Sequence, residues 1–282
     1  MTEGLLRALR AARDFRPQRF LALTLGADRI GWIRGDHVER LRAWPGIFEF
    51  ADKSLLLLPA PQAALSHALA EVTQALARDG SVRGWRGETY AVRAASSGEP
   101  LFHIERAAMR FFGFTSSAAH LNGFFEATKR SVIARRAPNK AIDPGMLDNL
   151  VAGGVNSGQD AWQTLLRECG EEAGIAPALA RSAKPAGVLE VCREVADGLH
   201  SEVLHVHDLA LPADFVPRNT DGEVSEFLSL DAAALLERIA RGEMTVEAGL
   251  VSVEFMLRHR ALPDPDGKIA AAVQTCRLPK AS

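Results

Sequence analysis

The segment GGVNSGQDAWQTLLRECGEEAGI, residues 153–175, decides how the second half of the chain folds. It places three acids, Glu168, Glu171 and Glu172, at spacings of three and four residues. Because an α-helix turns every 3.6 residues, side chains at these spacings lie on one face of a helix. Like charges that close repel each other, so the cluster needs a positive charge over it. Mg²⁺ or Mn²⁺ fits this need, because hard divalent cations take oxygen ligands.

Local signals set the limits of this helix. Asp160 is a suitable N-cap, and Gln163 stands three residues later, as in a capping box. Gly174 follows the last turn, where glycine adopts the left-handed conformation at little cost. Ahead of the helix, Gly153 and Gly154 lie in a glycine-rich loop that lets backbone approach a metal or a substrate. A solvated acidic face is the alternative interpretation, and these flanking signals favour the functional one.

The whole segment resembles the Nudix box, a pattern written G-x5-E-x7-R-E-U-x-E-E-x-G-U, in which U is a bulky apolar residue. One position departs from the pattern, because Gln159 stands where its first acid falls. The resemblance implies metal-dependent hydrolysis of a nucleoside diphosphate linked to another group, or of a related diphosphate. The matching positions are Gly153, Arg167, Glu168, Glu171, Glu172, Gly174 and Ile175, with Cys169 in the first U position.

The resemblance also implies roles for the acids. It assigns Glu168, Glu171 and Glu172 as catalytic residues that bind Mg²⁺ or Mn²⁺, with one of them polarising the attacking water. A further acid usually comes from elsewhere in the fold. Acids at positions 221, 223 and 226 precede or begin a predicted strand, and Glu223 is our choice among them. The alternative for Glu223 is an ordinary residue of a turn.

Arg167, Gly174 and Gln159 are expected to have structural roles within the motif. Arg167 is predicted to tie the helix to the loop before it. Because the expected partner at position 159 is a neutral glutamine, this contact would be a hydrogen bond in place of an ion pair.

Three cations upstream of the glycine-rich loop are candidates for binding the substrate. Arg135, Arg136 and Lys140 stand at the end of a predicted strand. Arginine binds phosphate in a bidentate way and lysine binds it as a point charge. We therefore expect one of the three to bind the diphosphate, together with the loop at Gly153 and Gly154. Ordinary charges at the end of a strand are the alternative.

The sequence on both sides of the Nudix box narrows the resemblance. It is similar to Nudix proteins that carry an N-terminal domain of unknown function and are related to the Nudix half of fungal thiamine pyrophosphokinase. That group implies hydrolysis of thiamine diphosphate, or of its oxidised analogues, to the monophosphate. Three alternatives stay open: an 8-oxo-nucleotide or other nucleoside diphosphate hydrolase, a non-catalytic module that binds a nucleotide-like ligand, and an isomerase on the same fold. The segments concerned are residues 101–108, 122–123, 134–140, 144–149, 151–154, 214–217 and 221–224.

The length of 282 residues and the order of predicted elements indicate two domains. Residues 1–115 are predicted to form an α+β domain that selects the substrate, and residues 116–265 the Nudix domain. A C-terminal tail, residues 266–282, follows. The predicted fold class is α/β, with a mixed sheet between helices in an α/β/α sandwich. Helices are predicted at 3–13, 62–79, 102–114, 231–240 and 247–260, and strands at 20–25, 30–35, 37–44, 54–60, 89–95, 184–195, 200–211 and 224–231. Residues 119–137 are predicted to form two strands, or one strand with a bulge at Gly123.

Composition restricts the partners. The net charge is −2 without a long basic stretch, which does not favour binding to a nucleic acid polymer. No apolar run approaches the roughly 20 residues that span a bilayer, so no membrane partner is expected. Three scattered cysteines and an N-terminus without a signal sequence are typical of a cytoplasmic protein. The expected partner is a small-molecule diphosphate, and a homodimer agrees with the frequency of dimers in the family.

Overall fold

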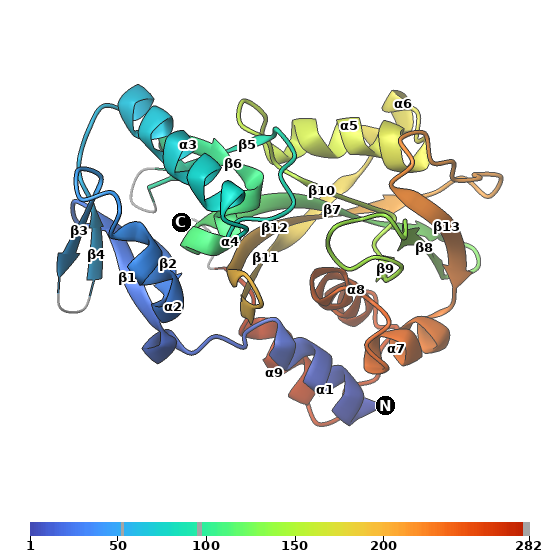
Figure 1. Cartoon of the computed structure of the whole chain (residues 1–282). Coiled ribbons are helices and arrows are strands. Elements are labelled where there is room, and N and C mark those ends of the chain that lie inside the picture. The colour runs from blue at the N-terminus through green and yellow to red at the C-terminus, as the bar shows by residue number, and fades with distance from the viewer. Residues whose placement is uncertain (52–53, 95–97, 279–282) are drawn as a thin grey trace.

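The computed structural model describes residues 1–51, 54–94 and 98–278. Two α/β bodies lie side by side in Figure 1, a smaller N-terminal domain and a larger C-terminal domain. No helix in the described ranges combines the length and the apolar character required to cross a membrane.

The N-terminal domain consists of two small sheets and the helices that cover them. Its first sheet has the strand order β2-β1-β4-β3, and its second is the hairpin β5-β6. Aromatic side chains such as Phe48, Phe102 and Phe112 fill the space between these elements. The elements are β1 (Phe20–Leu25), β2 (Asp28–Arg34), α2 (Gly35–Leu41), β3 (Phe48–Ala51), β4 (Ser54–Leu57), α3 (Gln62–Arg78), β5 (Thr89–Arg93), β6 (Pro100–Glu105) and α4 (Met109–Phe112).

A seven-stranded mixed sheet forms the centre of the C-terminal domain. Its strand order is β11-β12-β7-β8-β13, with β10 beside β7 and β9 beside β8. Strand β12 runs parallel to β7, whereas β10 runs antiparallel to it. The elements are β7 (Thr115–Phe125), β8 (Arg130–Arg136), β9 (Leu147–Asp148), β10 (Val151–Gly154), α5 (Ala161–Ala173), α6 (Pro177–Ala180), β11 (Lys184–Val195), β12 (Gly198–Ala210), β13 (Val224–Leu230), α7 (Ala232–Ala240), α8 (Val246–Arg258) and α9 (Lys268–Gln274).

Helices cover both faces of this sheet (Figure 1). Helix α5 buries Leu165 and Cys169 against β7 and β10, where Leu121 and Val151 face it. Helix α8 lies on the opposite face with α7. The predicted fold class, an α/β/α sandwich with a smaller α+β domain before it, is therefore confirmed.

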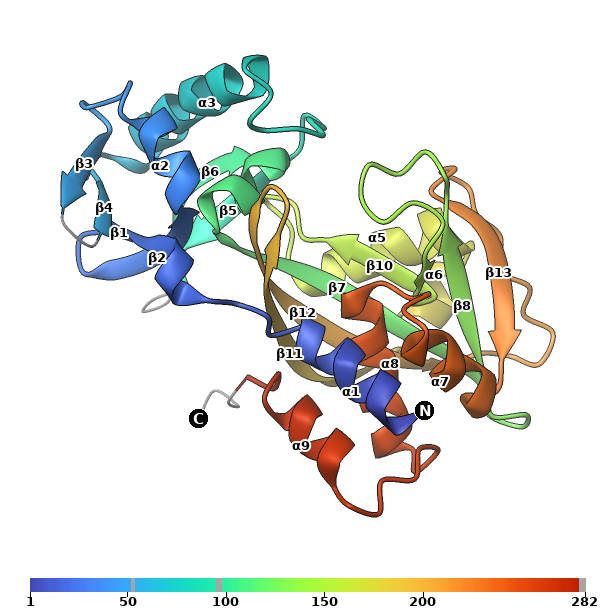
Figure 2. The same cartoon turned by 60° about the horizontal axis from the view of Figure 1, so that its bottom comes forward.

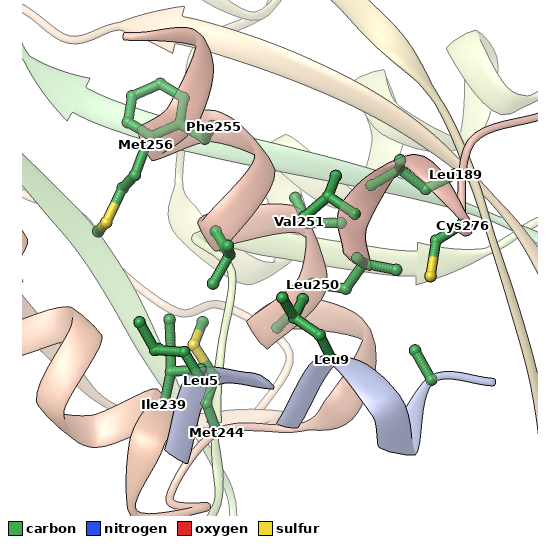
Figure 3. Packing of buried hydrophobic residues seen from close by; sticks show 14 of the residues in the cluster. Leu5, Leu9, Leu189, Ile239, Met244, Leu250, Val251, Phe255, Met256 and Cys276 are labelled. Atoms are coloured by element: carbon green, nitrogen blue, oxygen red, sulfur yellow. The ribbon is translucent and has the colours of Figure 1, made fainter. Parts of the chain in front are cut away.

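The first helix, α1 (Thr2–Ala11), lies on the C-terminal helices and away from the sheets of the N-terminal domain (Figure 2). Its Leu5 and Leu9 are buried beside Ile239 and Leu250, as Figure 3 shows. These side chains recur every four residues, the spacing of a helical face. From α1 the chain passes to the N-terminal domain and returns to the C-terminal domain only at β7.

Predictions that rested on long periodic segments are confirmed. The helix expected at 62–79 is α3, and the hairpin expected around residues 197–198 joins β11 to β12. Residue 95, the end of the strand expected at 89–95, lies outside the described residues.

Three predictions of elements were wrong. Residues 37–44 were expected as a strand, but Gly35–Leu41 is helical, because burial of Val38 and Leu41 follows a helical face. Residues 102–114 were expected as one helix ending at Gly113. The first part is wrong, because Pro100–Glu105 is a strand in which Phe102 and Ile104 alternate into the core beside β5. The last part is helical, since Met109–Phe112 forms α4 and Gly113 ends it. No element was expected after residue 263, yet Lys268–Gln274 is the helix α9. Residues 279–282 of the predicted tail lie outside the described residues.

Candidate active site

Helix α5 begins and ends where the sequence predicts. The Asp160 carboxylate accepts a hydrogen bond from the Gln163 N–H at 2.7 Å, and the Gln163 side chain accepts one from the Asp160 N–H at 3.0 Å. This is a complete capping box. Gly174 ends the helix in the left-handed conformation, with φ 64°. Both caps fix where the helix begins and ends, so Glu168, Glu171 and Glu172 all lie within it.

Three carboxylates gather at the C-terminal half of α5. Oxygen atoms of Glu168, Glu171 and Asp221 all lie within 4.8 Å of one another. Asp221 belongs to the loop before β13, which is held on the helix because the N–H and the hydroxyl of Thr220 donate to the Glu171 carbonyl at 2.9 and 2.8 Å. Carboxylate oxygens are the ligands that Mg²⁺ and Mn²⁺ prefer. The group therefore fits a hard divalent cation.

Glu172 lies beside this group and is not a member of it among the described residues. Its carboxylate is 7% exposed and accepts a hydrogen bond from the Ala152 N–H at 2.9 Å. Burial, together with the nearby charge of Glu168, raises the pKa of Glu172. The structure thus holds this acid between the helix and the glycine-rich strand β10.

Glu168 lies directly against β10. A Cβ atom built on Gly153 would overlap the Glu168 side chain, so a glycine is required at position 153. Burial raises the pKa of Glu168, although the Arg167 guanidinium opposes this effect. The first glycine of the motif therefore makes room for one of the predicted metal ligands.

Arg167 has different partners from those expected. Its guanidinium contacts Glu168 at 2.7 Å and Glu171 at 2.6 Å, whereas Gln159 accepts a hydrogen bond from the Thr164 hydroxyl at 3.4 Å. Two charged carboxylates on the same helix attract the guanidinium more strongly than one neutral amide does. Arg167 therefore pairs with Glu168 and Glu171 in place of Gln159, and its charge partly neutralises the acidic face of the helix.

Glu223, the downstream acid chosen from the sequence, forms an ion pair with Lys140 and lies 4.0 Å from Arg86. Burial acts to raise the pKa of Glu223, but the hydrogen bond and charge of Lys140 outweigh it, and the pKa is lowered. The acid that joins the helix carboxylates is Asp221, and Glu223 lies beside the cations.

The three upstream cations are separated by the alternation of strand β8. Arg135 donates to Glu226 at 2.8 Å and does not line the cavity described below. Arg136 donates to Asp148 at 2.8 Å and does line it, as does Lys140. Neighbouring residues of a strand point to opposite faces, so Arg135 and Arg136 cannot serve the same site.

A cavity of about 960 Å³ lies between the two domains. The C-terminal domain lines it with Lys140, Gly153 and Gly154, among others. The N-terminal domain lines it with Arg86 and Tyr90, among others. Neither Arg86 nor Tyr90 was expected at the site, because nothing local to residues 86–90 indicates that they reach a segment more than sixty positions away.

Comparisons with known proteins identify the family. A NUDIX domain model matches residues 117–247, and a model described as a domain of unknown function, DUF4743, matches residues 4–116. The chain is 32% identical to Nudix hydrolase 20, chloroplastic, of Arabidopsis thaliana over 255 residues. The aligned region covers 85% of this chain and 68% of that protein. The protein belongs to the Nudix hydrolase family.

Two further proteins are similar to this chain. Nudix hydrolase 24, chloroplastic, of Arabidopsis thaliana is 33% identical over 85% of this chain and 68% of its own length. The crystal structure of DR0079 from Deinococcus radiodurans matches with a TM-score of 0.48 at 23% identity, covering 62% of this chain and 100% of that one. The NUDIX domain model and the two Arabidopsis relatives confirm the predicted enzyme class, a Nudix diphosphate hydrolase.

Proposed function

We propose that the protein hydrolyses thiamine diphosphate or its oxidised analogues to the monophosphate, using Mg²⁺ or Mn²⁺. The observation that carries the metal requirement is the group of Glu168, Glu171 and Asp221 oxygens within 4.8 Å of one another. Glu172, which is adjacent and buried, is proposed to complete this acidic site.

The residues of the Nudix domain divide the work of the reaction. Glu168, Glu171 and Asp221 would hold the cation, which supplies charge neutralisation of the diphosphate and activation of a water molecule. Lys140 lines the cavity and is placed to stabilise negative charge that develops on the phosphoryl oxygens. Glu223 acts through Lys140, because their ion pair orients the ammonium group. Gly153 and Gly154 line the cavity where the substrate is proposed to bind, and their lack of a side chain leaves room there for Glu168 and Tyr90.

One carboxylate of the cavity supports a cationic organic group on the diphosphate. Glu202 lines the cavity, accepts a hydrogen bond from the Ser116 hydroxyl at 2.9 Å and lies 3.6 Å from the His200 imidazole. A carboxylate held in this way attracts a cation, and the thiazolium ring of thiamine is one. Nucleotide bases are neutral at the same pH, which is why thiamine diphosphate is preferred over an 8-oxo-nucleotide in this proposal.

The N-terminal domain, expected from the sequence as residues 1–115, is proposed to take part in selecting the substrate together with the Nudix domain, residues 116–265. Helix α1 belongs to the first range but packs on the C-terminal helices, so the proposed role falls on the elements after it. The side chains of those elements form one wall of the cavity that the glycine-rich strand also lines. The segment 266–282 contributes α9 to the helical layer on the far side of the sheet.

Product analysis tests the proposal. Thiamine diphosphate, its oxidised analogues, 8-oxo-dGTP, ADP-ribose and NADH are each incubated with the protein and Mg²⁺ or Mn²⁺, and phosphorus NMR identifies the products. We expect monophosphate from a thiamine compound at the highest kcat/KM. Glu202→Gln is expected to raise KM for the thiamine compound by about tenfold, the loss of one charge-assisted contact, and to leave KM for 8-oxo-dGTP unchanged.

The outcomes separate the alternatives. A higher kcat/KM for 8-oxo-dGTP would replace thiamine by a nucleotide as substrate. Rearrangement with the diphosphate intact would indicate an isomerase, and binding without any product would indicate a non-catalytic module. Equal effects of Glu202→Gln on both substrates would contradict the role given to this carboxylate.

A further inference from the structure

Tyr90 brings a phenol from the N-terminal domain to the Nudix motif. It is the single tyrosine of the sequence and lies in β5 with 4% of its surface exposed. A Cβ atom built on Gly154 would overlap the Tyr90 hydroxyl group, so the hydroxyl touches the backbone of the glycine-rich strand. Gly153 makes room for Glu168 and Gly154 makes room for Tyr90, because neighbouring residues of a strand face opposite ways. The second glycine of the motif therefore accommodates the N-terminal domain.

Hydrogen bonds fix strand β5 to the loop that leads into α5. The Ser157 N–H donates to the Thr89 carbonyl at 2.7 Å, and the Ser157 hydroxyl lies 2.8 Å from both the carbonyl and the hydroxyl of Thr89. Tyr90 follows directly in the chain. The position of Tyr90 against the motif is consequently set by the hydrogen bonds between Thr89 and Ser157 as well as by its own side chain.

The Tyr90 hydroxyl is available to a ligand. Tyr90 lines the cavity between the domains, and among the described residues its hydroxyl makes no hydrogen bond. Burial raises the pKa of Tyr90, so the phenol stays protonated and acts as a hydrogen-bond donor at neutral pH. A protonated donor that faces a cavity suits an oxygen-rich ligand.

Arg86 reaches the same cavity from the loop before β5. Its N–H donates to the buried Glu105 carboxylate at 3.0 Å, which holds the loop in place. Its side chain is 34% exposed and lies 4.0 Å from Glu223, the acid that binds Lys140. This contact is long for an ion pair, so the guanidinium keeps donors for another partner.

Arg106 contacts the ring of Tyr90. Its guanidinium lies 5.7 Å from the centre of the Tyr90 ring and forms an ion pair with Glu88 at 3.0 Å. The contact with the ring face restricts the ring, and the ion pair occupies Arg106 itself. Arg106 also lines the cavity, but its charge is already paired with Glu88, so we treat it as a positioning residue for Tyr90.

We propose that Tyr90 and Arg86 bind the diphosphate of the substrate directly, so that residues of both domains form the active site. The inference rests on the proposed function in one respect, namely that the substrate is a diphosphate. The phenol donates one hydrogen bond and the guanidinium up to two to phosphoryl oxygens that the carboxylate-bound cation does not occupy. The organic group is not specified by these contacts.

Two conservative variants test the proposal on whichever diphosphate the wild-type protein cleaves fastest. Tyr90→Phe removes only the hydroxyl, and Arg86→Gln removes the charge and the guanidinium donors while keeping a polar side chain. Each is expected to lower kcat/KM by about 10- to 100-fold, the value of a hydrogen bond to a charged group. Arg78→Gln is the matched control, because Arg78 lies at the end of α3 and does not line the cavity. It should leave kcat/KM unchanged, and all three variants should keep the wild-type unfolding temperature.

A binding measurement keeps this inference separate from the proposed function. Titration calorimetry with methylenediphosphonate and Mg²⁺ reports on the diphosphate site without hydrolysis, and both variants should weaken binding by a similar factor. If the wild-type protein cleaves no diphosphate, the proposed function fails while this titration still tests Tyr90 and Arg86. Wild-type kinetics and wild-type affinity in both variants would overturn the inference and leave the hydrolase assignment in place.

Discussion

Helices α5 and α8 lie on opposite faces of the same sheet, and both carry buried acids, but these acids are neutralised differently. In α8, the Arg258 guanidinium binds Glu254 at 2.7 Å and Asp208 of the neighbouring strand at 2.6 Å. Arg277 forms a second ion pair with Glu254. Burial acts to raise the pKa of Asp208, but Arg258 and Asn122 outweigh it and lower the pKa. Every charge in this group has an opposite charge beside it.

In α5, one guanidinium serves several acids. Arg167 is shared between Glu168 and Glu171, and Glu172 receives the Ala152 N–H without an ion pair among the described residues. The pKa values of Glu168 and Glu172 are raised, mainly by burial. A buried charge without a partner costs stability, so its retention is explained best by a ligand that supplies the charge. The comparison distinguishes acids that stabilise the fold from acids that serve a site.

The largest effect is expected at α5. Glu168→Gln should lower kcat by about 10³-fold or more, since a metal site contributes several kcal/mol to stabilisation of the transition state. The free energy of unfolding measured without metal should stay the same or rise, because a poorly neutralised carboxylate is removed. Steady-state kinetics and urea unfolding measure both quantities. A variant with full activity would show that the acidic face of α5 is not the metal site.

The reverse pattern is expected at α8. Glu254→Gln leaves Arg258 and Arg277 without their shared acid, and breaking a buried ion pair costs about 3 kcal/mol of unfolding free energy. Activity per folded molecule should be unchanged, because Glu254 lies in α8, on the face of the sheet opposite the carboxylates of α5. Urea unfolding and kinetics on the same preparation measure the two effects. Unaltered stability together with lost activity would show that Glu254 serves the active site and does not stabilise the fold.

The smallest effect concerns pH. Since the pKa of Asp208 is lowered below its ordinary value of 3.8, its ion pair stabilises the protein above that pH and is lost as the pH falls further. Asp208→Asn should therefore flatten the fall in unfolding free energy on the acid side of that value. Glu168 and Glu172 have the opposite effect on the unfolding free energy. Because their pKa values are raised in the folded protein, they lower the unfolding free energy as the pH rises above 4.5. Urea unfolding across this pH range measures both slopes, and an unchanged acid slope in Asp208→Asn would contradict the first.

The features that could be predicted from the sequence are local. Asp160, Gln163 and Gly174 act on backbone groups within a few residues, so the limits of α5 follow from their spacing. The error at residues 102–114 has a local cause as well. A short apolar run satisfies both periodicities, and the pairing of Phe102 and Ile104 with β5 decided for a strand.

The features that could not be predicted depend on contacts between distant segments. Asp221 and Glu223 are two residues apart, and only the hydrogen bonds of Thr220 to the end of α5 determine which of them approaches the helix acids. Tyr90 is brought to Gly154 by the docking of one domain on the other. No periodicity in the sequence encodes either contact.

The place of α1 has a mechanical consequence for the N-terminal domain. Two segments connect that domain to the rest of the molecule. One joins α1 to β1, and the other joins α4 to β7. Leu5 and Leu9 fasten the first connection in the core beneath α8, and the second is a central strand of the sheet. A domain tethered at two fixed points has fewer ways to swing than one on a single hinge. The N-terminal domain, which carries Tyr90, is consequently attached at two points. We expect this to restrict hinge motion across the cavity between the two domains.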